Sequence, residues 1–180
     1  MSLEKFSAEL NKYQQSLPPV ESWNPSHCGD IDIEIKRNGD WFHEGSAFKR
    51  MPLVKLLSSV LIREQTSDND DYFLITPVEK MRIRVEDAPF VLTHWQWQEN
   101  EQAMLVETNV GDSFILNGEH PIECGEDGSL YVIVRRNLKA KVHRNVYYQW
   151  VDLATEEKTS QGTELVFTSA KCQFSLGKIS

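Results

Sequence analysis

The sequence predicts an α+β protein made of two related antiparallel β-rich halves, with one N-terminal helix and one helix inserted in the first half. Period-two alternation of apolar and polar residues, typical of half-buried strands, dominates from residue 72 to 152. Apolar residues at helical spacing occur clearly in two earlier stretches. A short strand-like motif also recurs, since Met81–Val85 resembles Leu138–Val142. These three observations together give the fold class.

The N-terminal helix is predicted from a stripe of apolar residues at three- and four-residue steps. The pair Pro18-Pro19 ends this stripe, because proline cannot continue a helix. Residues 18–25 then form an extended arm that we expect Trp23 to anchor. The stripe consists of Leu3, Phe6, Leu10, Tyr13 and Leu17.

The first half begins with a predicted strand and hairpin. Isoleucines at 31, 33 and 35 alternate with charged residues, which indicates a half-buried strand. Asn38-Gly39 is a strong hairpin signal and leads into a second strand through Trp41 and His43. A helix is then expected over residues 50–65, with Pro52 tolerated in its first turn.

Further strands are predicted from alternation, and only residues 153–158 are expected to be helical in the C-terminal half. The predicted organisation is an N-terminal helix and proline-rich arm at 1–25, a first half at 26–98 and a second half at 99–180. The predicted strands are Tyr72–Thr76, Met81–Val85, Val91–Trp97, Met104–Glu107, Leu130–Val134, Leu138–Val142, Val146–Val151 and Glu164–Thr168.

The internal repeat indicates a duplication. Met81–Val85 and Leu138–Val142 are 57 residues apart, and each is followed at the same distance by an aromatic residue, Phe90 or Tyr147. Gly39–Phe42 resembles Gly111–Phe114 at a separation of 72 residues. The difference in separation is about the length of the inserted helix. Chance similarity of short alternating strands is the alternative explanation.

Composition limits the function. A formal charge of −8 argues against nucleic acid and against an anionic membrane as partners, because both attract basic surfaces. Three scattered cysteines favour reduced thiols over a disulfide framework or a zinc site. No signal-peptide pattern occurs at the N-terminus, and the longest apolar segment, 52–62, is too short to span a bilayer. We therefore expect a cytoplasmic protein.

Five blocks of sequence carry a family resemblance: Pro18-Pro19 with Trp23-Asn24-Pro25, Gly29–Ile33, Gly39–Gly45, Leu74–Lys80 and Val85–Phe90. In this order they resemble the bacterial domain-of-unknown-function 1285 family, over nearly the whole chain. The family has no assigned activity. The resemblance implies a duplicated β-rich fold whose C-terminal half is pleckstrin-homology-like. It also implies a pocket between the halves for a nucleotide-derived ligand and a role in signalling.

His43-Glu44 is the first candidate for chemistry. On a strand these side chains point to opposite faces, so they cannot serve one substrate together. His43 would share the face of Trp41 and could contact a ligand or act as acid or base. A histidine at the edge of the core, bonded to a backbone carbonyl, is the structural alternative.

Basic and polar residues near turns form the second group of candidates. Arg50 precedes the inserted helix, whose N-terminus favours anions. Thr76, Glu79 and Lys80 join two strands and are either a solvated turn or anion contacts. Arg82 and Arg84, with Lys139 and Lys141, form rows that either protect sheet edges or attract a phosphate. Arg144 either helps to bind an anion or makes a structural ion pair.

Other motifs exclude several classes of site. No Walker P-loop, GxGxxG or GxSxG motif occurs, which disfavours nucleotide hydrolysis, Rossmann-type binding and serine hydrolase chemistry. Asp30, Asp32 and Glu34 share a strand face, and His27-Cys28 precedes them, yet no metal-binding spacing accompanies them. We expect no metal and no cofactor.

The sequence therefore predicts a ligand-binding or signalling module that takes a small anionic ligand in a cleft between the halves. A protein-interaction scaffold without a small ligand is one alternative. An enzyme using His43 as acid or base is the other, and a non-enzymatic role is favoured. The candidate ligand-binding residues are Trp23, Trp41, His43, Arg50, Thr76, Glu79, Lys80 and Arg144.

Overall fold

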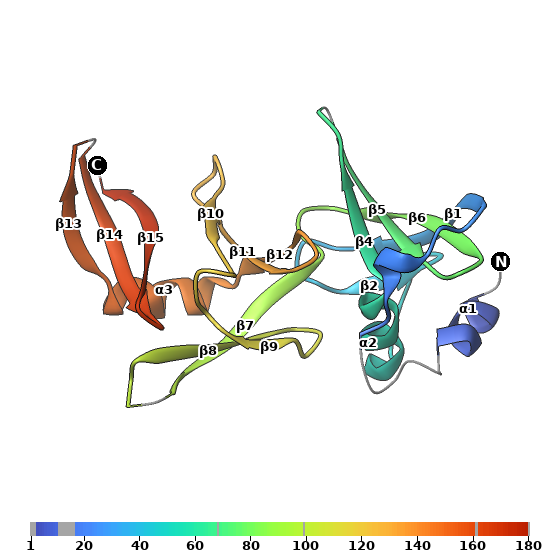
Figure 1. Ribbon diagram of the computed structural model, residues 1–180, viewed down its shortest axis with the longest axis horizontal. Coiled ribbons are helices and arrows are strands. Elements are labelled where there is room, and N and C mark those ends of the chain that lie inside the picture. The colour runs from blue at the N-terminus through green and yellow to red at the C-terminus, as the bar shows by residue number, and fades with distance from the viewer. Residues whose placement is uncertain (1–2, 11–16, 68, 99, 161, 180) are drawn as a thin grey trace. The chain divides into compact units, whose positions relative to one another are not determined.

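The computed structural model describes residues 3–10, 17–67, 69–98, 100–160 and 162–179. The chain divides into two compact units, Met1–Asp87 and Ala88–Ser180, and each is described by itself (Figure 1). The predicted boundary after residue 98 differs from this division by one strand. The predicted mostly β character is confirmed by two six-stranded mixed sheets and one three-stranded sheet.

The described residues of the first unit form two α-helices, α1 (Leu3–Leu10) and α2 (Met51–Ser59), and a short 3-10 helix, η2 (Val20–Ser22). Its sheet has the strand order β3-β2-β1-β6-β5-β4. The strands are β1 (His27–Ile35), β2 (Trp41–His43), β3 (Ser46–Ala47), β4 (Leu61–Gln65), β5 (Asp70–Ile75) and β6 (Glu79–Val85).

The second unit contains a six-stranded sheet of order β10-β11-β12-β7-β8-β9 and a three-stranded sheet of order β13-β14-β15. Helix α3 (Arg144–Leu153) lies between them in the chain. The strands are β7 (Phe90–Gln98), β8 (Ala103–Thr108), β9 (Ser113–Ile115), β10 (Ile122–Cys124), β11 (Leu130–Arg135), β12 (Leu138–Val142), β13 (Thr155–Thr159), β14 (Gly162–Ser169) and β15 (Cys172–Ile179).

Both six-stranded sheets are mixed, so the prediction of antiparallel halves is corrected. The central pairs β1–β6 and β7–β12 are parallel, whereas the outer pairs are antiparallel. Parallel neighbours need a long crossover, because the chain must return to the same end of the sheet. In the first unit this crossover includes α2, β4 and β5. Short-range alternation carries no information about such long-range pairing.

The two six-stranded sheets have the same topology. If the strands are numbered within each unit, so that β7 is strand 1 of the second sheet, and if the second sheet is read from its β9 edge, both sheets have the order 3-2-1-6-5-4. Strands 1 and 6 are parallel in both. The recurring motif falls on strand 6 of each: Met81 and Ile83 of β6, and Leu138 and Ala140 of β12, are all buried. The two copies of the motif recognised in the sequence therefore lie on equivalent strands of the two sheets.

Helix α2 is shorter than the predicted helix at 50–65, which is a correction. It ends at Ser59, and Leu61–Gln65 form β4, paired with β5. The Ser58 and Ser59 hydroxyls donate to the carbonyls of Lys55 and Leu56 at 2.8 and 2.6 Å. Such local bonds compete with the helix backbone and favour its end.

Residues 146–151, predicted as a strand, lie in α3, and residues 155–159 form a strand where helix was expected. His143 caps α3, since its Nδ1 accepts from the Asn145 N–H at 3.2 Å. Val146 and Trp150, one helical turn apart, are the buried residues of α3. The six residues 146–151 are too few to distinguish the two-residue period of a strand from the 3.6-residue period of a helix. Burial in the folded protein decides between the two.

The N-terminal prediction is only partly described. Helix α1 covers Leu3–Leu10, and the predicted continuation at 11–16 lies outside the described residues. Leu17 is not in a helix and is 52% exposed. Among the described residues, no helix has both the length and the apolar character needed to cross a bilayer.

Candidate functional site

A hollow of about 270 Å³ in the first unit contains two of the predicted ligand-binding residues, His43 and Arg50. We call it the β3–α2 hollow, because β3, the segment after it and the start of α2 supply most of its wall. The lining residues are Leu3, His43, Ser46, Ala47, Phe48, Lys49, Arg50 and Leu53.

A tight hairpin places His43 at this hollow. Strand β2 ends at His43, and Glu44 and Gly45 form the turn with φ angles of 47° and 74°. Positive φ at both central residues is the type I′ pattern that suits the twist of a hairpin. Glu44 therefore belongs to a turn, which corrects its predicted place on a strand opposite His43. His43 pairs with Ser46 across the hairpin.

Phe48 links the hollow to the core. Its ring lies 6.4 Å from that of Trp41 in an edge-on arrangement and 6.2 Å from the His43 imidazole. Trp41 itself is only 3% exposed. The apolar contact with Phe48 holds the wall of the hollow on the sheet, and the imidazole edge remains half-buried at its side.

Lys49 and Arg50 place two cations at the N-terminus of α2. Both are exposed, and neither forms an ion pair within the part of the chain that the structure describes. Arg50 is the N-cap residue without a side-chain cap bond, and the first turn of α2 holds no acidic residue. A helix N-terminus carries partial positive charge, so two cations there are unfavourable unless an anion joins them. This arrangement can attract a carboxylate or a phosphate.

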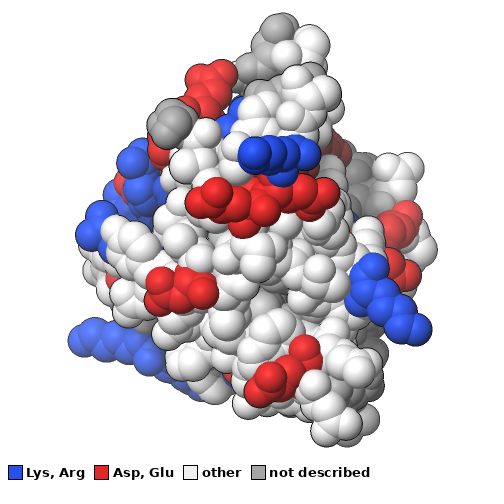
Figure 2. All heavy atoms as spheres, turned by 90° about the vertical axis from the view of Figure 1, so that its left-hand side faces the viewer, with Lys and Arg blue, Asp and Glu red and all other residues white. Residues whose placement is uncertain are grey.

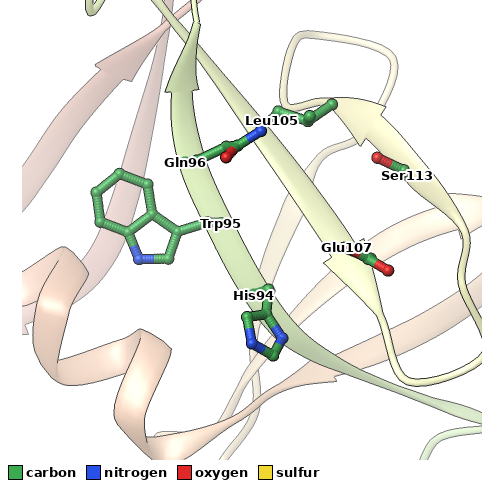
Figure 3. Close-up of a pocket in the computed structure, with 6 residues that line it drawn as sticks. All are labelled: His94, Trp95, Gln96, Leu105, Glu107 and Ser113. Carbon is green, nitrogen blue, oxygen red and sulfur yellow. The ribbon is translucent and has the colours of Figure 1, made fainter.

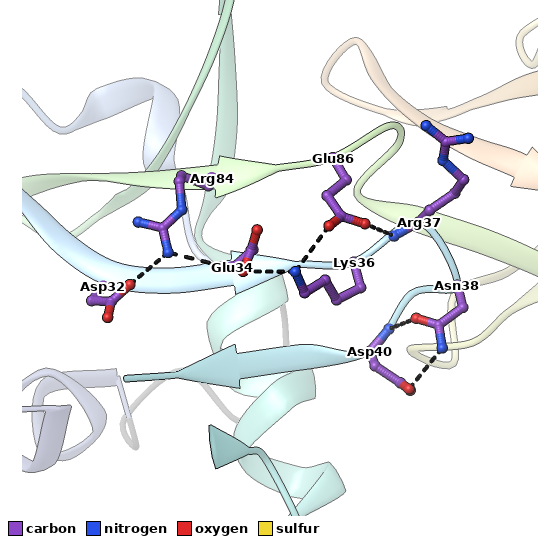
Figure 4. A network of polar contacts seen from close by, with 8 residues as sticks. All are labelled: Asp32, Glu34, Lys36, Arg37, Asn38, Asp40, Arg84 and Glu86. Atoms are coloured by element: carbon purple, nitrogen blue, oxygen red, sulfur yellow. Dashed lines mark hydrogen bonds and ion pairs between the residues drawn. The ribbon is translucent and has the colours of Figure 1, made fainter. Parts of the chain in front are cut away.

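The charges on the central strands β1 and β6, and on the residues directly after them, are instead paired with each other (Figure 4). Asp32 and Arg84 are 2.6 Å apart, and Lys36 lies 3.0 Å from Glu34 and 2.9 Å from Glu86. The parallel register of β1 and β6 brings acids opposite bases. The predicted carboxylate row and arginine row therefore neutralise each other.

The pKa values of these groups reflect the pairing. Hydrogen bonds from the Lys36 ammonium and the Arg37 backbone N–H hold the pKa of Glu86 below its ordinary value. Hydrogen bonds to Glu86 and Glu34 raise the pKa of Lys36. Both side chains are solvent-exposed, so the pair contributes little to stability.

Thr76, Glu79 and Lys80 lie outside the β3–α2 hollow. The buried Thr76 hydroxyl accepts from the N–H groups of Val78 and Glu79, at 3.3 and 3.1 Å, and donates to the Glu79 carbonyl. Lys80 pairs with Glu64, and its ammonium lies 4.3 Å from the centre of the Phe73 ring. These contacts build the turn between β5 and β6.

The two tryptophans among the candidate ligand-binding residues differ in exposure. Trp41 is buried, so its ring has no open face for a ligand. Its indole N–H is a buried donor without a hydrogen-bond partner among the described residues. Trp23 follows η2 and is half-buried, and its backbone N–H donates to the Val20 carbonyl at 3.1 Å. Neither tryptophan lines the β3–α2 hollow.

Arg144 lies in the second unit, at a separate hollow of about 380 Å³ that we call the β12–α3 hollow. Lys141 and Arg144 line it together with Asp127, Tyr147 and Tyr148. Hydrogen bonds from the Ser129 N–H and hydroxyl lower the pKa of Asp127. The Asp127 carboxylate stays ionised and offsets one of the two cations.

A third hollow, of about 160 Å³, lies on β7, β8 and β9 (Figure 3). The strand register aligns His94 with Glu107 and Glu107 with Ser113, so the carboxylate is in the middle. Nucleophilic catalysis requires the imidazole between serine and carboxylate, which this order does not give. Trp95 points to the other side, where its Nε1 donates to Gln149 Oε1 at 2.7 Å.

No group of three or more histidine, cysteine, aspartate or glutamate side chains in the described ranges is placed to hold a metal ion. Cys28, Cys124 and Cys172 are free. The face that carries the three-stranded sheet shows charges of both signs side by side, with uncharged surface over most of it (Figure 2).

Lys49 lines the hollow but is not among the residues predicted from the sequence, although it is adjacent to Arg50. The signal was present: basic residues 49 and 50 stand at the start of the helix predicted over 50–65, and no acidic residue follows in its first turn. Acidic residues normally occupy that position because of the helix dipole. Leu3 and Ala47 could not have been identified, because only the fold brings α1 and β3 together.

Comparisons with known proteins find the same family in both units. A family model described as "Domain of unknown function (DUF1285), N-terminal domain" matches residues 18–88, and the corresponding C-terminal domain model matches residues 89–176. No curated protein matches the chain.

Two solved structures are also similar to this chain. A DUF1285 family protein from Silicibacter pomeroyi DSS-3 is 32% identical, with a TM-score of 0.83 over 99% of this chain and 96% of that chain. Another, from Shewanella baltica OS155, is 31% identical, with a TM-score of 0.54 over 67% and 90%. The chain is therefore a member of the DUF1285 family, with both its N-terminal and its C-terminal domain.

Proposed function

We propose that this protein is a ligand-binding module and that the β3–α2 hollow binds a small anionic ligand. The observation that carries the proposal is the pair of cations at the start of α2. Lys49 and Arg50 adjoin a helix N-terminus and have no ion pair among the described residues. A bound anion would relieve their repulsion from the helix dipole.

The contrast with other cations of the first unit supports this choice. Lys80, Arg82 and Arg84 of β6 all lie within ion-pair distance of carboxylates on other strands of the same sheet. A ligand anion would compete there with carboxylates that are already in place. At the β3–α2 hollow the described lining contains no acidic side chain, so an anion meets no local repulsion.

We further propose a cytoplasmic signalling role in which ligand occupancy is passed to a partner. The free cysteines support a reducing compartment. The family resemblance favours nucleotide-derived ligands, and a nucleotide would present the phosphate that Lys49 and Arg50 suit. A cleft between the halves stays a prediction, and the proposed site lies within one unit.

Duplication of one ancestral sheet belongs to the same proposal. The common strand order, the parallel central pair and the repeated motif on strand 6 support it. We also retain the pleckstrin-homology-like relation of the second unit. Helix α3 follows the sixth strand of its sheet, as a closing helix would, whereas the three-stranded sheet after α3 has no place in that relation.

The two alternatives find less support. An enzyme using His43 would need a group to orient the imidazole, and the described lining of the hollow includes no carboxylate. A scaffold without a small ligand would favour one contiguous exposed apolar patch. The large exposed apolar residues are instead spread along the chain, at Leu17, Met51, Val78, Tyr148, Leu153 and Ile179.

A thermal-shift screen tests the proposed function. Inorganic phosphate, AMP, ADP and short carboxylates are added to the wild type and to the double variant Lys49→Gln/Arg50→Gln. We expect at least one anion to raise the Tm of the wild type and not of the double variant. Lys55→Gln is the matched control, because Lys55 is exposed on the same helix but does not line the hollow. Absence of any shift would contradict the proposal.

A further inference from the structure

We propose that the ligand of the β3–α2 hollow is an amphipathic anion: one carboxylate or phosphate group carried by a short apolar tail. This inference rests on the proposed function, because it uses the same hollow. It adds the chemical class of the ligand, which the cations alone do not define.

The apolar part of the hollow is the first argument. Leu3 of α1, Ala47 of β3, Phe48 and Leu53 of α2 contribute four apolar side chains from separate elements. Such a surface favours a ligand that removes apolar area from water. A bare phosphate would leave this surface wet and use only the cations.

The polar part of the hollow is the second argument. It consists of His43, Ser46, Lys49 and Arg50. Lysine and arginine only donate hydrogen bonds, which leaves the Ser46 hydroxyl and one imidazole nitrogen as acceptors among these side chains. A sugar or a base needs several acceptors for its own donors. An anion on a hydrocarbon tail needs none, so this lining suits it better than the nucleotide-derived ligand that the family resemblance favours.

Size gives the third argument. The hollow of about 270 Å³ lies just below the range of about 300–1,000 Å³ typical of small-molecule sites. It equals the volume of about nine water molecules at about 30 Å³ each. The hollow can therefore take only a short tail beside the anionic group, so the gain from chain length should level off once the hollow is filled.

The ligand is expected to be a soluble monomer rather than a lipid in a bilayer. A formal charge of −8 makes the whole chain unfavourable near an anionic membrane. The two cations of the hollow are a local exception. They suit one headgroup, and a polybasic membrane-binding surface would need more.

Isothermal titration of the full chain tests the ligand class. The probes are inorganic phosphate and butyl, hexyl and octyl phosphate below their micelle concentrations, with octanol as the neutral control. We expect the affinity to increase about two- to fourfold for each methylene from butyl to octyl phosphate. Octanol should bind at least about tenfold more weakly than octyl phosphate, because it lacks the charge-assisted bonds.

Variants test the contributions of the apolar and the cationic part of the hollow separately. Leu53→Ser should flatten the dependence on chain length, and Ala47→Phe, which fills the hollow, should weaken octyl phosphate more than inorganic phosphate. Lys49→Gln/Arg50→Gln should weaken all alkyl phosphates by the same factor. Lys55→Gln should change nothing. Circular dichroism of each variant verifies the fold, and the Ala47 variant preserves the test if Leu53→Ser unfolds.

Each outcome separates this inference from the proposed function. Equal affinity for inorganic phosphate and octyl phosphate would overturn the amphipathic ligand and leave anion binding intact. Binding to phosphatidylglycerol vesicles without binding to monomeric octyl phosphate would overturn the soluble ligand. If the thermal-shift screen and the titrations both find no anion that binds, the proposed function itself is wrong.

Discussion

The two six-stranded sheets share one topology but differ in what their outer faces carry. In the first unit, acidic residues of β1 face basic residues of β6, and the exposed face is largely self-neutralised. In the second unit, Lys141 of β12 is opposite Val91 of β7, and Lys139 pairs with Glu123 of β10. The buried positions thus maintain the common topology while the outward positions diverge.

The position of the helix relative to the sheet is the second difference between the two units. The first sheet has α2 between its third and fourth strands, whereas the second sheet has α3 after its sixth strand. Only α2 begins with two cations that have no described ion pair, while α3 begins with a histidine cap followed by Arg144. The ligand site proposed here follows from this difference in helix placement.

The largest effect should come from the helix of the second unit. Trp150 is fully buried in α3, and its ring lies 5.2 Å from that of Phe167 in β14. Trp150→Ala should cost about 3–5 kcal/mol of the free energy of unfolding, since it leaves a large cavity. Urea unfolding measures this cost. Tyr148→Ala, on the exposed side of the same helix, should change it by under about 0.5 kcal/mol.

The fifth strands of the two sheets differ in how their tyrosines are buried. Burial raises the pKa of Tyr72 in β5 to about 12 from an ordinary value of 10, whereas Tyr131 in β11 lies on the outer face near Lys141. Because the unfolded chain ionises first, this stabilisation is complete below pH 10 and is lost as the pH rises towards 12. The unfolding free energy should fall by about 1 kcal/mol per pH unit in that window.

Tyr72→Phe provides the control for this titration, because phenylalanine cannot ionise. Urea midpoints at pH 9, 10 and 11 should decline less steeply in this variant than in the wild type. Parallel declines in both proteins would mean that other groups cause the loss of stability.

Two loops with the same geometry give the third prediction. In the loops 36–40 and 108–112, the first residue's N–H donates to the fifth carbonyl and the fourth residue is a glycine at φ 88°. Gly39→Ala and Gly111→Ala should each cost about 1–2 kcal/mol, because a Cβ is strained in the left-handed region. Clearly unequal costs in urea unfolding would show that the loops are not equivalent.

The smallest effect should come from the exposed ion pairs of the first sheet (Figure 4). Arg84 and Asp32 have side chains that are 62% and 52% exposed, so water already solvates both charges. Arg84→Gln should leave the urea midpoint unchanged within error at physiological salt. A clear loss of stability, removed by 1 M salt, would show that the charge row acts as a network.

These loops also show how far sequence similarity can be interpreted. The resemblance of Gly39–Phe42 to Gly111–Phe114 reflects a common loop, yet one loop joins strands 1 and 2 of its sheet and the other joins strands 2 and 3. Phe90 and Tyr147 are likewise not equivalent, because one starts β7 and the other lies in α3. Only the motif on β6 and β12 falls on equivalent strands.

Strands with clear alternation were predictable, and several turns were not. The limits predicted for Leu138–Val142 coincide with those of β12. By contrast, Ala170 and Lys171 adopt φ angles of 48° and 64° between β14 and β15, although neither is a typical turn residue. Parallel pairing of β1 with β6 depends on a long crossover, which local patterns do not encode.

The candidate site was predictable to a similar extent. His43 and Arg50 were identified from residue type and position, and the structure brings them to one hollow. Lys80 was chosen for its charge, but its pairing with Glu64 depends on the arrangement of strands β4 to β6. The difference between a paired and an unpaired cation depends on tertiary structure, which one sequence does not reveal.

One titration tests the central claim most directly, because it compares the two sets of cations in the first unit. Octyl phosphate is titrated into the double variants Lys49→Gln/Arg50→Gln and Arg82→Gln/Arg84→Gln, which remove the same charge. We expect the first variant to lose at least about tenfold in affinity and the second to bind like the wild type. Equal losses in both variants, or a larger loss in the second, would contradict the claim.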